Sequence, residues 1–172
     1  MNIKHIASEY WAKRWVKITL EVLFFILLYL ALRAYMQRDV ISGTAPPIQA
    51  TTIQQQPFDL ATSRPKPVLV HFWATWCGIC KLEQDSIQAL SEDYNVITVA
   101  MQSGSDQEVQ AYLDEHQLTF KVINDVDDTW VSAYGVRGVP ASFVVNSDNQ
   151  ITSSEVGYTT GWGLRLRMWL TN

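Results

Sequence analysis

Both cysteines of the chain, Cys77 and Cys80, stand three positions apart directly after an apolar, β-like run over residues 67–72. A helix that begins at Cys77 would place unpaired backbone N–H groups and the positive end of its dipole beside the Cys77 sulfur. Cys80 would lie one helical turn further on, close enough to form a disulfide. The pattern therefore predicts a strand, a tight turn and a helix that carries a redox-active pair at its N-terminus.

Such a pair works as a two-electron switch. We expect Cys77 to attack a substrate disulfide as an exposed thiolate and Cys80, more sheltered, to resolve the mixed disulfide. The same spacing also serves zinc sites, haem attachment and structural disulfides. Zinc needs about four ligands, and the chain has only these two cysteines and three histidines. Haem attachment needs a histidine where Lys81 stands, and a disulfide across so small a loop restricts the unfolded chain little. We therefore expect no metal and no cofactor beyond the redox-active disulfide.

Residues 70–80, Val-His-Phe-Trp-Ala-Thr-Trp-Cys-Gly-Ile-Cys, resemble the active-site strand and helix start of thioredoxin-fold proteins, and Trp-Ala-Thr-Trp-Cys is similar to the TlpA/ResA-like branch. Residues 135–145 resemble the family's loop and strand that carry a cis-proline opposite the cysteines. The resemblance spans residues 57–170. It implies that Pro140 is cis and that the backbone of Val139 lies beside the disulfide. The alternative is an ordinary trans proline that opens a strand.

The resemblance also suggests roles for residues around the pair. We assign Trp76, Gly78 and Ile79, together with Val139, to substrate binding. His71 stands where thioredoxins have an aspartate and many TlpA-like proteins an asparagine. Its imidazole is either a proton relay for Cys80 or a core histidine without a kinetic role, and both interpretations stay open.

One acidic position close to the pair completes the candidate site. Glu83 resembles an acidic residue that often follows the cysteines in TlpA-like sequences. For Glu83 itself we expect a solvated position on the helix surface.

Hydrophobic periodicity divides the rest of the chain into alternating elements. Helices are expected over residues 81–93, 106–116, 127–134 and 161–170, and strands over 96–101, 120–123, 141–145 and 150–156. The last two strands are separated by Ser147-Asp148-Asn149, which is typical of a hairpin turn. With the strand before Cys77, this order predicts an α/β three-layer sandwich. The family resemblance implies that the sandwich is thioredoxin-like, with a central mixed sheet.

The N-terminal third differs in composition. We expect a cytoplasmic segment over residues 1–15, a transmembrane anchor over 16–36, a flexible linker over 37–56 and the thioredoxin-like domain over 57–172. The apolar run contains one acidic residue, Glu21, near one end. Four basic residues precede the run and two follow it, which orients the N-terminus to the cytoplasm. Cleavage of the run as a signal peptide is the alternative.

The part of the chain after residue 39 is acidic, with seven Lys and Arg against fourteen Asp and Glu, so nucleic acid is not an expected partner. The resemblance and the anchor imply a protein-disulfide reductase in the bacterial inner membrane, with its domain in the periplasm. Its expected partners are protein disulfide substrates and an electron-donating membrane thiol reductase.

Several narrower roles remain open. The layout resembles the copper-sensitivity-suppressor (ScsD-like) type, which suggests a role in copper tolerance. A cytochrome c maturation reductant is a second hypothesis, although Ala141 stands where those proteins usually carry an acidic residue. Two hypotheses from different functional classes are a Cu(I)-binding module that uses the two thiolates and a noncatalytic interaction domain.

Overall fold

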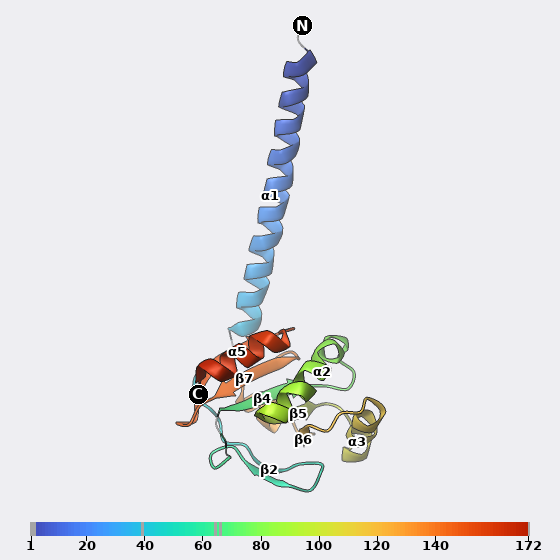
Figure 1. The fold of residues 1–172 in the computed structure, drawn as a ribbon, viewed down its shortest axis with the longest axis vertical. Coiled ribbons are helices and arrows are strands. Elements are labelled where there is room, and N and C mark those ends of the chain that lie inside the picture. Colours follow the sequence, from blue (N-terminus) through green and yellow to red (C-terminus); the bar gives the residue numbers. More distant parts are fainter. Residues whose placement is uncertain (1–2, 39, 64, 66, 172) are drawn as a thin grey trace. The chain divides into compact units, whose positions relative to one another are not determined.

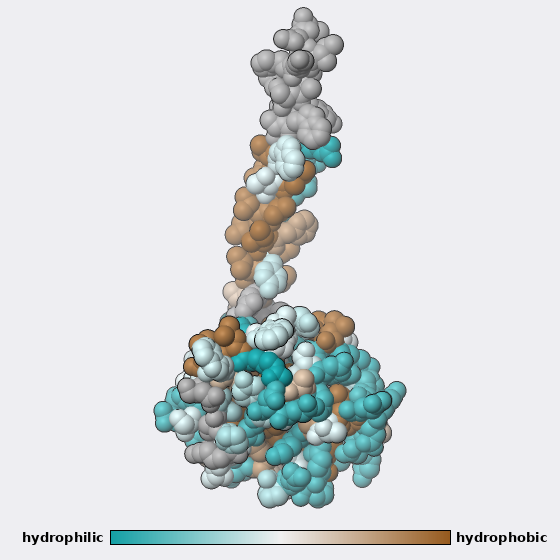
Figure 2. Space-filling model, viewed as in Figure 1, coloured by the Kyte–Doolittle hydropathy of each residue, from teal (hydrophilic) through white to brown (hydrophobic). Residues whose placement is uncertain are grey.

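The computed structural model describes residues 3–38, 40–63, 65 and 67–171, and the chain divides into two compact units, Met1–Arg38 and Asp39–Asn172. The first unit consists of one long helix, α1 (Ile3–Gln37). Its segment Arg14–Leu32 is long and apolar enough to cross a membrane, and none of that segment is buried (Figure 2). The second unit is an α/β domain, which we describe by itself.

A six-stranded mixed sheet forms the centre of this domain, in the order β1-β8-β7-β4-β5-β6 (Figure 1). These strands are β1 (Gly43–Thr44), β4 (Val68–Trp73), β5 (Asn95–Met101), β6 (Lys121–Asp125), β7 (Ala141–Val145) and β8 (Gln150–Val156). β4 runs parallel to β5 and antiparallel to β7. All six residues of β4 are buried, as expected for a central strand that is covered on both faces.

Helices α2 (Gly78–Asp93), α3 (Asp106–Glu115) and α5 (Gly161–Thr171) lie on one face of the sheet. α2 and α5 pack against each other, and α5 also packs on β7. α3 lies against α2, where the Tyr112 hydroxyl donates to Gln84 at 2.7 Å. Leu69, His71 and Trp73 point to this face because side chains alternate along a strand.

The opposite face is covered by α4 (Thr129–Ala133) and by the segment before β4. Phe72, Tyr134 and Phe143 form an aromatic cluster there, with ring centroids 5.0–5.7 Å apart. The predicted three-layer sandwich with a mixed sheet is therefore confirmed. The predicted helices and strands after residue 80 are all present, with ends that shift by a few residues.

The prediction of a flexible linker over residues 37–56 is wrong for most of that range. β1 joins the edge of the main sheet, and β2 (Gln49–Thr51) pairs with β3 (Pro57–Asp59) as a separate hairpin. Ile48 is fully buried, and the Tyr134 hydroxyl donates to the carbonyl oxygen of Pro46 at 3.0 Å. The few apolar residues of this segment are therefore part of the core, and only residues 38–42 separate α1 from β1.

Candidate active site

Cys77 and Cys80 form a disulfide, with their Cα atoms 5.3 Å apart. Cys77 is the N-cap of α2, and its sulfur accepts a hydrogen bond from the Cys80 N–H at 3.1 Å. The tight turn before it is held by two contacts outside α2. The Ser103 hydroxyl accepts from the Thr75 N–H at 3.1 Å, and the Trp76 indole donates to the Gln102 carbonyl oxygen at 3.0 Å. In the reduced pair, the Cys80 N–H and the helix dipole would stabilise a thiolate on Cys77.

One side of the disulfide faces solvent, and we call it the front surface: Trp76, Gly78, Ile79 and Val139. Trp76 is 60% exposed and Ile79 is 49% exposed. The cysteines themselves are 6% and 3% exposed. The predicted contrast between an exposed and a sheltered sulfur is therefore small in this oxidised state, and the apolar neighbours provide most of the accessible area.

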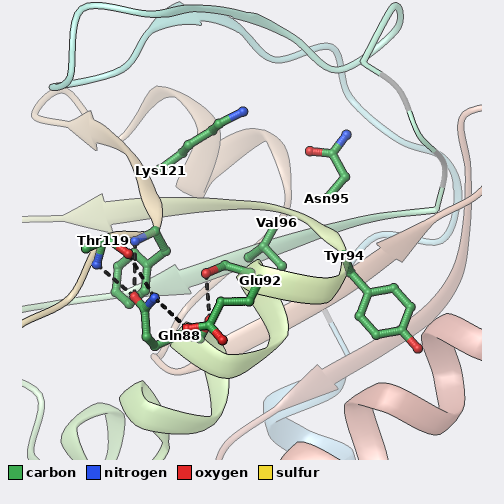
Figure 3. Close-up of a pocket in the computed structure, with 9 residues that line it drawn as sticks. Gln88, Glu92, Tyr94, Asn95, Val96, Thr119 and Lys121 are labelled. Atoms are coloured by element: carbon green, nitrogen blue, oxygen red, sulfur yellow. Dashed lines mark hydrogen bonds between the residues drawn. The ribbon is translucent and has the colours of Figure 1, made fainter.

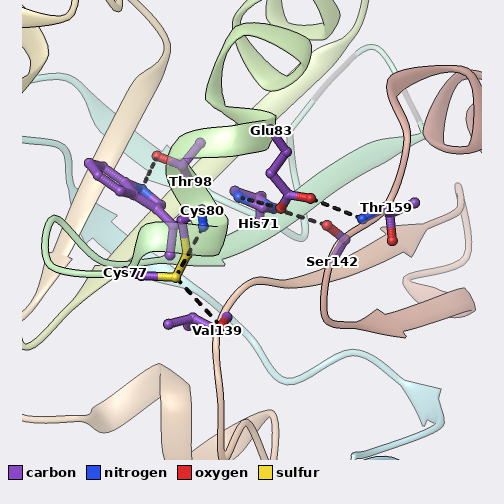
Figure 4. A network of polar contacts seen from close by, with 9 residues as sticks. His71, Cys77, Cys80, Glu83, Thr98, Val139, Ser142 and Thr159 are labelled. Atoms are coloured by element: carbon purple, nitrogen blue, oxygen red, sulfur yellow. Dashed lines mark hydrogen bonds and ion pairs between the residues drawn. A yellow bond between two sulfur atoms is a disulfide. The ribbon is translucent and has the colours of Figure 1, made fainter. Parts of the chain in front are cut away.

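The loop before β7 completes the front surface. The Val139–Pro140 peptide bond is cis, as predicted. The Val139 carbonyl oxygen lies 3.6 Å from the Cys77 sulfur (Figure 4). Val139 therefore lies beside Cys77, as the resemblance implies.

The other side of the disulfide is a buried polar cluster of His71, Glu83 and Ser142 (Figure 4). His71 Nδ1 lies 2.9 Å from the Ser142 hydroxyl oxygen, and His71 Nε2 lies 3.6 Å from a Glu83 carboxyl oxygen. The other Glu83 oxygen accepts the Thr159 N–H at 3.0 Å. The cluster thus joins β4, α2, β7 and the segment before α5.

The expectation that Glu83 is a solvated helix residue is wrong, because its exposed fraction is 1%. Glu83 follows Cys80 by three positions on α2, so both side chains lie on the same inward face of the helix. Thr159, from a distant loop, covers the carboxyl group from outside. The position of Glu83 near the cysteines could be read from the sequence, but the burial of its side chain could not.

Burial shifts both titratable groups of the cluster toward their neutral forms. Desolvation lowers the pKa of His71 to about 3. Desolvation also raises the pKa of Glu83 to about 7, and the hydrogen bond from the Thr159 N–H opposes this rise. His71 is therefore neutral at physiological pH, whereas Glu83 can gain or lose a proton there.

A small cavity connects the cluster with the disulfide. It has a volume of about 10 Å³ and is lined by His71, Trp73, Cys80, Gln84, Ile87 and Phe120. This volume is comparable to that of about one water molecule. Cys80 and His71 therefore border the same small space behind the disulfide.

A larger hollow of about 170 Å³ lies at the far end of α2 and includes neither cysteine in its lining (Figure 3). There, Gln88 Oε1 accepts the Thr119 N–H at 2.7 Å and the Phe120 N–H at 3.2 Å. Its Nε2 donates to the Thr119 hydroxyl at 2.9 Å. These contacts fix the loop that leads into β6, so we assign this hollow a structural role.

Among the described residues, no group of three or more His, Cys, Asp and Glu side chains is arranged to hold a metal ion. The cysteine pair and its acidic neighbour offer a chemistry of their own. A thiol pair at a helix N-terminus can exchange disulfides, and a carboxyl group with a pKa of about 7 can move the associated proton.

Two curated relatives cover most of the chain. A thioredoxin-like protein from Haemophilus influenzae is 27% identical over 158 residues, which represent 91% of this chain and 94% of the relative. The thiol-disulfide oxidoreductase ResA from Bacillus anthracis is 26% identical over 137 residues, 77% of this chain and 79% of the relative.

The fold has solved counterparts, and a family model matches the domain. The crystal structure of StoA from Bacillus subtilis superposes with a TM-score of 0.64 at 22% identity, over 74% of this chain and 98% of that one. The model of the AhpC/TSA family matches residues 41–154, which is about two thirds of the chain. The chain therefore belongs to the AhpC/TSA family, with the thioredoxin-like fold and the cysteine pair of a thiol-disulfide oxidoreductase.

Proposed function

We propose that the chain is a membrane-anchored protein-disulfide reductase whose domain lies in the bacterial periplasm. The observation that carries the proposal is the Cys77–Cys80 disulfide at the N-terminus of α2. The loop with cis-Pro140 lies on its solvent-facing side, and buried Glu83 lies on its inner side. Similarity to proteins named thiol-disulfide oxidoreductases supports the same chemistry.

The reaction begins with the reduced pair. The Cys77 thiolate, stabilised by the Cys80 N–H, attacks one sulfur of a protein disulfide. A bond forms between Cys77 and that sulfur, the substrate disulfide breaks, and the other substrate sulfur leaves as a thiolate that takes up a proton. The front surface holds the substrate through its apolar side chains and through the backbone of Val139.

Cys80 then resolves the mixed disulfide. Its thiol loses a proton and its sulfur attacks Cys77, so that the Cys77–Cys80 disulfide forms and the second substrate thiol is released. Glu83 is the proposed proton acceptor, because its pKa of about 7 matches neutral pH. His71, with a pKa of about 3, is too weak a base to hold the proton, and we assign it to orienting Glu83. An electron-donating membrane thiol reductase restores the dithiol.

The direction of electron flow is tested by equilibrating the protein with glutathione. A potential of about −270 mV, similar to that of thioredoxin, supports a reductase. A potential of about −120 mV, similar to that of a strong periplasmic oxidant, contradicts it. Reduced protein should also reduce a model disulfide such as insulin, and the Cys77→Ala variant should not.

The proposed topology rests on α1. The segment Arg14–Leu32 is apolar, and Glu21 pairs with Lys17 at 3.8 Å, which lowers the penalty for a carboxylate near one end of the segment. Four basic residues lie before the apolar run that begins at Ile18 and two lie after Leu32, which supports a cytoplasmic N-terminus. Protease added to spheroplasts should digest the domain. Protection of the domain, or a mature N-terminus near Tyr35, contradicts this topology.

A further inference from the structure

The outward side of α5 carries four large apolar side chains, Trp162, Leu166, Trp169 and Leu170, which we call the α5 outer face. Their exposed fractions are 84%, 55%, 65% and 66%. Spacings of four, three and one residues place them on one side of the helix. In Figure 2 the domain surface is mostly teal, and brown and pale areas gather over α5. A contiguous apolar surface of this kind usually marks a binding site.

The inward side of the same helix already supplies its packing. Leu164 and Met168 are 1% and 0% exposed and lie in the core. The α5 outer face is therefore not needed to attach the helix to the sheet. It also surrounds a shallow hollow of about 290 Å³, lined by Tyr94, Trp162, Arg165, Leu166 and Trp169. Arg165, which lines this hollow, bonds Asp93 and lies over the Tyr94 ring, 6.0 Å from its centroid.

The chain enters the domain beside α5. β1 pairs with β8 through Gly43 and Ile151, and the next β8 residue, Thr152, has its hydroxyl 2.9 Å from that of Thr171 at the end of α5. The connection from α1 to β1 is residues 38–42, and five residues span at most roughly 18 Å. A membrane anchor in α1 would therefore keep the α5 end of the domain within reach of the bilayer.

We propose that the α5 outer face binds the lipid headgroup region of the membrane in which α1 is anchored. The proposal depends on the membrane anchoring proposed above. Tryptophan side chains prefer the membrane–water interface, and leucines beside them enter the upper acyl region. The short connection gives the face a high effective concentration of lipid, which favours lipid over a partner that must diffuse to the face. Docking would limit the orientations that the domain can take relative to the bilayer.

The test uses the full chain, labelled with fluorotryptophan, at one copy per lipid nanodisc. The lipid is a phosphatidylcholine and phosphatidylglycerol mixture that contains a gadolinium-chelating lipid. Fluorine resonances are assigned by single Trp→Phe variants. We expect the Trp162 and Trp169 resonances to be lost in the gadolinium discs, while the Trp76 resonance keeps its intensity. Trp15, at the start of the apolar segment, reports insertion of α1.

The outcomes separate the two proposals. If the Trp15 resonance is lost and the Trp162 and Trp169 resonances are retained, lipid docking is overturned and the membrane anchor stands. Retention of all three resonances overturns both the anchor and the docking. If Trp162 and Trp169 respond only when two copies share a disc, a second copy of the chain covers the face, and lipid docking is wrong.

Paired variants sharpen the result. Leu166→Glu with Leu170→Glu places two carboxylates on the exposed face, and it should restore the Trp162 and Trp169 resonances in gadolinium discs. Val126→Glu is the matched control, because Val126 is 65% exposed directly after β6, the strand at the opposite edge of the sheet from β1. Loss of Trp162 and Trp169 should be unchanged in this control. An unchanged loss in the double variant as well would contradict docking through these leucines.

Discussion

The two sides of the Cys77–Cys80 disulfide differ in almost every physical property. The front surface is apolar and mostly exposed, and none of its four residues carries a titratable side chain. The polar cluster behind the disulfide is buried, and two of its three side chains titrate. This difference supports the proposal that substrate contact and proton transfer use separate groups around one pair of sulfurs. Substitutions should therefore separate binding from pH dependence.

The largest expected effect concerns the two sulfurs between these sides. Cys77→Ala should abolish turnover, because Cys80, the other cysteine of the chain, is assigned to resolution of the mixed disulfide. Cys80→Ala should leave the first attack intact and trap mixed disulfides through Cys77. Trapped complexes are detected on nonreducing gels and identified by mass spectrometry. Trapping that needs Cys80 and survives the loss of Cys77 would reverse the assigned roles.

The next effect concerns the buried acid. Glu83→Gln keeps the size of the side chain and removes the proton acceptor, so resolution at pH 8 should slow by about 10²-fold. In the native protein the resolution rate should rise as the pH increases through about 7, because Glu83 becomes ionised there. Stopped-flow measurement of mixed-disulfide turnover between pH 5.5 and 8.5 checks both points. A variant that retains the native rate and the native pH profile would exclude Glu83 as the base.

The same variant should change the pH dependence of stability in the oxidised protein. The pKa of Glu83 is raised from 4.5 to about 7 on folding, so the unfolded chain loses its proton first as the pH rises. The native protein therefore loses stability between pH 4.5 and 7, by about 3 kcal/mol at about 1.4 kcal/mol per pKa unit. The Glu83→Gln variant should not show this decrease in the free energy of unfolding. Chemical unfolding of both proteins at pH 4.5 and 8 measures it, and equal losses would contradict burial of the carboxyl group.

His71→Asn should have a smaller effect on rate, about tenfold or less, because His71 acts through Glu83. Asparagine can still reach the Ser142 hydroxyl, so we expect only a small change in melting temperature at neutral pH. Ser142→Ala, which removes the partner of Nδ1, is the matched control. A large loss of stability in both variants, with an unaltered pH profile for resolution, would return His71 to a structural role.

The His71→Asn variant should also change how the free energy of unfolding depends on pH below 6.5. Burial lowers the pKa of His71 from 6.5 to about 3, so the unfolded chain binds the proton first as the pH falls. The native protein should lose about 2 kcal/mol from this group between pH 6.5 and 5, and more at lower pH. In His71→Asn this contribution disappears. Equal acid sensitivity of the two proteins, measured by unfolding at pH 5 and 6.5, would contradict it.

The smallest effect is expected at the front surface. Trp76→Ala removes an exposed ring that contributes apolar contact with a substrate, so KM should rise by about threefold with little change in kcat. The pH profile should match that of the native protein. Leu82→Ala is the control, since Leu82 is exposed on α2 outside the front surface. A shift of the pH profile in Trp76→Ala would show that the two sides of the disulfide are coupled.

Most of the fold could be predicted from the sequence, because it depends on local patterns. The apolar run before Cys77, the spacing of the cysteines and the periodicity of the later segments each reflect interactions within a few turns or strands. The cis isomer at Pro140 followed from resemblance to a family, since the sequence pattern alone allows either isomer. The structure of residues 43–56 could not be predicted, because a few apolar residues among Gln, Thr and Pro give no clear period.

The strand, the turn and the helix that present Cys77 and Cys80 follow from the sequence alone, since the turn and helix start depend on local geometry. The burial of Glu83, in contrast, depends on long-range packing, because its carboxyl group accepts the N–H of Thr159, 76 residues away in the chain. Long-range packing also decides the environment of His71, whose partner Ser142 lies 71 residues away on an adjacent strand. A pKa depends on what surrounds a group in space, and that surrounding exists only after distant segments pack together.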